Sequence, residues 1–171
     1  MEWLPLTDLD LSKLGMTAVL EAQAKAFAAT ALKTLKRKSH AEWTRIERTQ
    51  FSQICKCLIT AGAGINDQLC ELIRQLDEAR TYGHELRHMV VHASWGLDAE
   101  GQPTSYDYGR TRKLDRSDID EAMNACLELR LLAHRLLMRI GHLIGEGVLY
   151  EGTDTGASMT INISGGRTVM L

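Results

Sequence analysis

Residues 117–145 read SDIDEAMNACLELRLLAHRLLMRIGHLIG, and this stretch decides the fold. Ser117 followed by acidic residues is typical of a helix start, and Gly145 and Gly147 are typical of a helix stop. Between them, apolar residues recur at helical spacing: Met123, Cys126, Leu127, Leu131, Leu136, Leu137, Ile140 and Ile144. They fall on more than one face, and a helix with two apolar faces usually buries the second against another subunit. We therefore expect a long helix here and a homodimer.

Three more helices are expected before this one. Residues 17–38 are alanine-rich and have high helix propensity. Ser39-His40-Ala41-Glu42 has the spacing of a capping box and should open a second helix, which Ala61-Gly62-Ala63-Gly64 ends. Asn66 or Asp67 can cap a third helix, whose end is expected near Gly96.

The remaining segments are polar and rich in glycine. Residues 97–114 contain Gly101, Pro103 and Gly109, which predicts a loop or a small hairpin. Residues 150–171 form a Gly/Thr/Ser-rich tail that we expect to be irregular, although the alternation over 159–163 is typical of a short strand. The expected architecture is all-α, a single four- to five-helix up-and-down bundle over residues 1–149 followed by this tail.

The composition favours the same class and limits the function. Only two of the 171 residues are proline and 5% are aromatic, which argues against strand-rich sandwiches and barrels. The formal charge of −2 gives no global attraction to nucleic acid, so any such binding needs a local patch. Charged residues interrupt every apolar run before about 18 residues, so no membrane span is expected. Buried, reduced thiols are predicted for all four cysteines, as in a cytoplasmic protein: Cys55, Cys57, Cys70 and Cys126.

The chemistry is concentrated in residues 82–95, YGHELRHMVVHASW, at the end of the third expected helix. Three of the six histidines lie here, His84, His88 and His92, together with Arg87. One interpretation is a zinc site, because His84-Glu85-Leu86-Arg87-His88 matches H-E-x-x-H. The positive charge of Arg87 would crowd such a metal ion, and the sequence offers no compelling third ligand.

A second interpretation starts from Arg87, the polar His88 beside it, and His92, followed by Ala93 and Trp95. This R-H-x-x-x-H pattern near the end of a long helix resembles the HEPN superfamily (higher eukaryotes and prokaryotes nucleotide-binding). The expected bundle is similar to the HEPN fold over roughly residues 17–149. Many HEPN proteins are metal-independent endoribonucleases that act as toxins of toxin–antitoxin systems or as phage-defence effectors. The resemblance thus implies single-stranded RNA as substrate, no cofactor, and an antitoxin or nucleotidyltransferase as a partner.

RNA cleavage without a metal needs a base that titrates near neutral pH and a fixed cation for the phosphate. His92 is the expected base or acid, Arg87 the expected phosphate clamp, and His88 a positioning group. Five positions along one helix leave Arg87 and His92 roughly 140° apart. Either the helix ends near His92 or two subunits face each other, and the resemblance implies the second, a composite site at a dimer interface.

Other residues extend or oppose this hypothesis. The loop after the motif mixes aromatic and basic side chains, which is typical of RNA contact but also of a solvated loop: Tyr106, Tyr108, Arg110, Arg112 and Lys113. Trp95 is expected in the core or an interface, and His134 and His142, among leucines, are expected to be buried or at an interface. The alternative function is a non-catalytic HEPN module that binds nucleotides or proteins.

Overall fold

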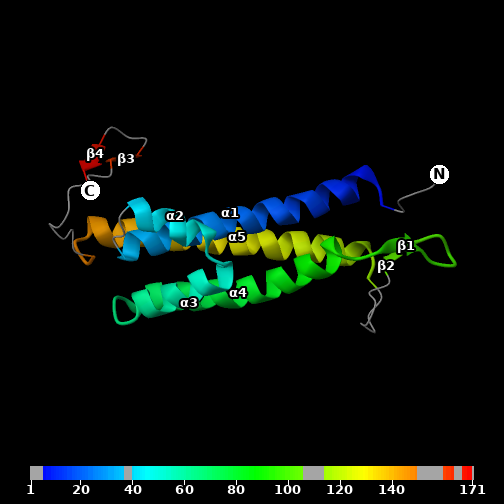
Figure 1. Ribbon diagram of the computed structural model, residues 1–171, viewed down its shortest axis with the longest axis horizontal. Coiled ribbons are helices and arrows are strands. Elements are labelled where there is room, and N and C mark those ends of the chain that lie inside the picture. The colour runs from blue at the N-terminus through cyan, green and yellow to red at the C-terminus, as the bar shows by residue number, and fades with distance from the viewer. Residues whose placement is uncertain (1–5, 37–39, 106–113, 150–159, 164–166, 171) are drawn as a thin grey trace.

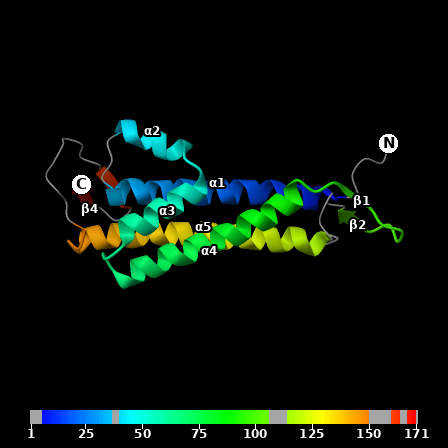
Figure 2. The ribbon, with the colours of Figure 1, turned by 60° about the horizontal axis from the view of Figure 1, so that its bottom comes forward.

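The computed structural model describes residues 6–36, 40–105, 114–149, 160–163 and 167–170. These residues form five helices and two short hairpins, which confirms the all-α class. The elements are α1 (Asp8–Lys36), α2 (His40–Arg48), α3 (Phe51–Gly62), α4 (Asp67–Val91), β1 (Trp95–Leu97), β2 (Pro103–Ser105), α5 (Arg116–Gly145), β3 (Thr160–Ile163) and β4 (Arg167–Met170). Successive helices reverse direction, so α1 and α5 run the same way side by side, and α4 runs against them (Figures 1 and 2).

The first helix starts earlier than residue 17, the predicted boundary, because Thr7 and Asp10 form a capping box. The Asp10 carboxylate accepts a hydrogen bond from the Thr7 N–H at 2.9 Å, and the Thr7 hydroxyl accepts one from the Asp10 N–H at 3.2 Å. These bonds satisfy backbone donors that have no partner inside the helix. The T-x-x-D pattern is visible in the sequence and was the signal for this start.

The second expected helix is two helices, α2 and α3, which is a correction to the prediction. Gln50 separates them, with an extended backbone at φ −62° and ψ 145°. The capping box expected at residue 39 lies outside the described residues. The expected stop is confirmed, since α3 ends at Gly62 and Gly64 adopts a φ of +77°, which favours glycine.

The core has two parts along the bundle. The larger joins α1, α3, α4 and α5 and contains fully buried Ile54, Leu76 and Leu136. The smaller lies near the β1–β2 hairpin, around Val90 and Ile119. All four cysteines are free thiols, but only two are buried as predicted. Cys57 and Cys70 are half-buried, because they flank the core-facing sides of their helices.

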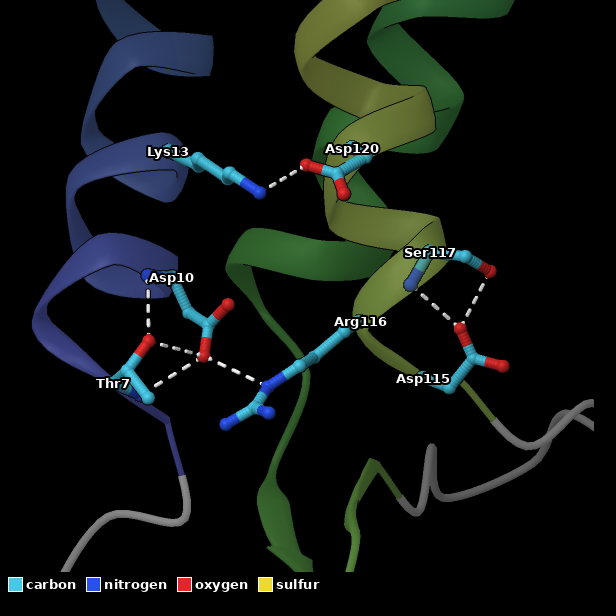
Figure 3. Close-up of polar contacts among 7 residues, drawn as sticks. All are labelled: Thr7, Asp10, Lys13, Asp115, Arg116, Ser117 and Asp120. Carbon is cyan, nitrogen blue, oxygen red and sulfur yellow. Dashed lines mark hydrogen bonds and ion pairs between the residues drawn. The ribbon is translucent and has the colours of Figure 1, made fainter.

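The starts of α1 and α5 are tied together (Figure 3). Arg116, the first residue of α5, donates from Nε to Asp10 Oδ2 at 3.0 Å, and Lys13 pairs with Asp120 one turn further along. Burial raises the pKa of Asp10, but the hydrogen bonds from Thr7 and the charge of Arg116 outweigh it and hold this pKa below its ordinary value. Asp115 caps α5 by accepting a hydrogen bond from the Ser117 N–H at 2.7 Å. The contacts of Arg116 and Lys13 with α1 therefore join two capped helix starts.

The segments around α4 agree with the sequence. Asn66 caps the helix by accepting a hydrogen bond from the Leu69 N–H at 3.2 Å. The predicted small hairpin is present, with β1 and β2 paired antiparallel.

The 150–171 tail is less irregular than expected, because β3 pairs antiparallel with β4. Within the described residues, no helix has both the length and the apolar character needed to cross a membrane.

Candidate functional site

Three exposed histidines line one side of the C-terminal half of α4. His84, His88 and His92 recur every four residues, and we call them the histidine row. The ring centroids of His84 and His88 are 6.3 Å apart, and those of His88 and His92 are 4.7 Å apart. The spacing of four residues places successive imidazoles one turn apart on one helix face. The imidazoles of His88 and His92 therefore lie next to each other and are exposed to solvent.

Glu21 of α1 faces the start of this row. One of its carboxylate oxygens lies 2.8 Å from His84 Nδ1, and the other lies 3.5 Å from Arg87 Nε. The side chains of Glu21 and Arg87 are 17% and 25% exposed, so this ion pair is partly shielded from water. Arg87 Nε is buried and makes no hydrogen bond to any of the described residues, since its contact with Glu21 is an ion pair without hydrogen-bond geometry. The Arg87 side chain thus reaches from α4 to α1, where it pairs with Glu21.

Arg87 and His92 point in different directions, as helix geometry predicts. Arg87 turns toward α1, while His92 caps α4 and packs against His88. The backbone N–H of His92 donates to the carbonyl of His88 at 3.2 Å, which places His92 at the end of the helix. The structure therefore brings His88 and His92 together but records no contact between Arg87 and His92.

A buried thiol of α5 contacts the backbone of α4 behind the site. Cys126 of α5 is buried, as predicted, and its thiol lies 3.8 Å from the carbonyl oxygen of Gly83. Burial raises the pKa of Cys126 to about 11; the negative charge of Glu21 adds to this rise, and the positive charge of Arg87 opposes it. The Glu21–Arg87 pair is therefore close enough to α5 for its charges to act on a core thiol.

Sequence reasoning missed Glu21. It lies in the alanine-rich first helix, far from the motif in the chain, and no local pattern marks it. Trp95 agrees with expectation: it is half-buried, packs on the smaller core and donates from Nε1 to the Val90 carbonyl at 3.1 Å.

Several expectations are not supported or lie outside the structure. The RNA-contact candidates Tyr106, Tyr108, Arg110, Arg112 and Lys113 all lie outside the described residues. His134 and His142 are exposed in the single chain, and so they are not core residues, because the apolar core face of α5 is turned away from them. Over the described ranges, no group of three His, Cys, Asp or Glu side chains is placed to hold a metal ion.

The chain matches no known protein family, no curated protein and no solved structure. The resemblance to HEPN proteins therefore stays a prediction that rests on the R-H-x-x-x-H pattern.

Proposed function

We propose that the protein is a metal-independent endoribonuclease of the HEPN type that acts on single-stranded RNA. The observation that carries this proposal is that the exposed rings of His88 and His92 are adjacent, with their centroids 4.7 Å apart. The half-buried Arg87 directly precedes His88 in the chain. An acid–base pair and a permanent cation are what RNA cleavage without a metal requires. A role as toxin or phage-defence effector, and an antitoxin or nucleotidyltransferase partner, belong to the same proposal.

The reaction uses each residue in a defined way. His92 accepts the proton of the ribose 2′-hydroxyl, and the 2′-oxygen attacks the adjacent phosphorus. The bond to the 5′-oxygen breaks, and this oxygen takes a proton from the protonated imidazole of His88 or from water that His88 orients. Arg87 stabilises the extra negative charge on the phosphate oxygens. The products are a 2′,3′-cyclic phosphate and a 5′-hydroxyl.

A second copy of the chain completes this site. Within one chain Arg87 is turned toward Glu21 and away from His92. Two chains that face each other with the α4 surfaces bearing the histidine row would place Arg87 of one beside His92 of the other.

The test is cleavage of single-stranded RNA by the full chain in EDTA. Arg87→Ala and His92→Ala should each lower the rate by at least about a hundredfold, the usual value of an acid–base group. His142→Ala removes an exposed histidine of α5 that lies outside the histidine row, and should leave the rate unchanged. Cleavage that survives both motif substitutions, or that needs an added metal ion, would refute the proposal.

Mixing the two inactive variants tests the composite site. A mixed dimer of Arg87→Ala and His92→Ala chains contains one site with both residues intact, so unfolding and refolding the mixture should restore cleavage. If the site lay within one chain, the mixture would stay inactive.

The Glu21–Arg87 ion pair favours a second candidate, a non-catalytic module. A carboxylate that already neutralises Arg87 opposes the binding of a phosphate at the same place. This function predicts that RNA stays intact while nucleotides or a protein bind near α4. Calorimetry with nucleotides, together with the cleavage assay, separates the two candidates.

A further inference from the structure

The outer face of α5 carries an apolar stripe that the described part of the chain leaves exposed. Leu127, Leu131 and Met138 are 40%, 41% and 62% exposed, and His134 is exposed between them. We call these four residues the α5 outer stripe. The same surface is hollowed into a shallow pocket, lined by Asn124, Leu127, Glu128, Leu131, Leu132 and Arg135.

The stripe has the spacing of a helix–helix seam. The steps from Leu127 to Leu131, His134 and Met138 are four, three and four residues, which is the heptad pattern of a and d positions. The fully buried Leu129 and Leu136 lie at the opposite heptad position and face the core. One helix therefore has a core face and, opposite to it, a second seam of the kind that packs on another helix.

The charged residues beside the α5 outer stripe favour a second copy of the chain in the antiparallel orientation. Glu128 and Arg135 are seven residues apart, so both flank the stripe on the same side. Both are exposed, and neither has an ion pair among the described residues. In an antiparallel pair with a twofold axis between Leu131 and His134, Glu128 of each copy faces Arg135 of the other. A parallel pair would instead place Arg135 opposite Arg130, which is a like-charge contact.

We propose that the α5 outer stripe binds a second copy of the chain in this antiparallel arrangement. Leu131 then faces His134 of the second copy, Leu127 faces Met138, and the Glu128–Arg135 pair forms twice. One side of the His134 ring packs on Phe27 of α1, with the ring centroids 5.3 Å apart, and the residue is nevertheless exposed, so the second copy would cover its other side.

This interface is separate from the proposed RNA site and does not rest on it. The histidine row borders α1 through the His84–Glu21 contact, whereas α5 packs on α1 and α4 through its buried side. The stripe and the row therefore belong to different helices, and pairing through the stripe is a separate contact from the composite site. Chains that pair through both faces form assemblies of four or more copies.

The experiment measures the mass of the full chain by light scattering at tens-of-micromolar concentration, against 19.1 kDa for one copy. Glu128→Arg or Arg135→Glu alone should halve the mass of the assembly and weaken the association about tenfold or more, because each places like charges together. The double variant, Glu128→Arg with Arg135→Glu, should restore it. Lys56→Glu, a charge reversal on exposed α3 surface, is the matched control.

The register has its own test. Leu127 and Met138 are eleven residues apart, about 16 Å along one helix, so cysteines at both positions cannot bond within a chain. Between antiparallel copies they face each other, and mild oxidation of Leu127→Cys/Met138→Cys should give a covalent dimer that the wild-type chain does not give. A wild-type mass of one copy, unchanged mass in both single reversals, or failure of the double reversal to restore association would overturn the proposal, whatever the result of the RNA assay.

Discussion

Replacing Asp10 by alanine should loosen the end of the bundle where α1 and α5 begin. The Asp10 side chain is 6% exposed and accepts hydrogen bonds from the Thr7 N–H at 2.9 Å, the Thr7 hydroxyl at 2.8 Å and Arg116 at 3.0 Å. The substitution removes one half of the capping box and the carboxylate on which these three donors converge. We therefore expect a lower free energy of unfolding with the fold unchanged.

The magnitude follows from the contacts. Loss of a helix cap costs about 1 kcal/mol, and a hydrogen bond to a charged group is worth about 1.5–3 kcal/mol when it is buried. Arg116 is 47% exposed, so solvent screening reduces its share to about 0–1 kcal/mol. The expected loss for Asp10→Ala is about 2–3 kcal/mol. This corresponds to a Tm lower by about 4–12 °C in a chain of this size.

The dependence on pH has a definite sign. Since the fold lowers the pKa of Asp10 from its ordinary 3.8, the ionised group stabilises the protein above that value. The stabilisation is lost as the pH falls through the lowered pKa.

Urea unfolding of wild type and Asp10→Ala should therefore differ by a constant amount between pH 7 and about pH 5, and by less below about pH 4. Arg116→Ala is the control and should cost no more than about 1 kcal/mol. Equal stability of Asp10→Ala and wild type at pH 7, or a difference that grows on acidification, would refute this reasoning.

Four further predictions test the core, a turn, the thiols and the site. Leu129→Ala should lower the free energy of unfolding by about 2–5 kcal/mol in urea titrations, because Leu129 is fully buried. Gly64→Ala should cost about 1 kcal/mol by the same method, because of the φ of +77°. Burial raises the pKa of Cys55 to about 12, with the negative charge of Asp77 adding to the rise, so a thiol reagent at pH 8 should label Cys57 quickly and Cys55 only on unfolding. Glu21→Gln should tighten RNA binding about two- to fivefold in a filter-binding assay by releasing Arg87.

The long helices were predictable because their signals are local. The apolar spacing of residues 117–145 and the Asn66 cap act within a few residues, and both are confirmed. The start of α1 was missed although its T-x-x-D capping box is equally local, because the apolar residues that follow it are spread over several faces of the helix. The break at Gln50 has no such signal, since it depends on how α2 and α3 each pack on α1.

The site was predictable only in part. The four-residue spacing of the histidine row follows from the sequence. The different directions of the Arg87 and His92 side chains follow from it as well. The contacts of Glu21 with His84 and Arg87 depend on how α1 and α4 pack, and no pattern within either helix encodes that pairing.

The most direct test of the central claim compares the cleavage of single-stranded RNA in EDTA by wild type, His92→Ala and His142→Ala. Both substitutions remove one exposed imidazole, so they change the protein surface to a similar extent. If the histidine row is an RNA-cleaving site, wild type and His142→Ala release products with 2′,3′-cyclic phosphate ends at the same rate, and His92→Ala is at least about a hundredfold slower. Equal rates for all three proteins, or no cleavage by wild type, would contradict the claim.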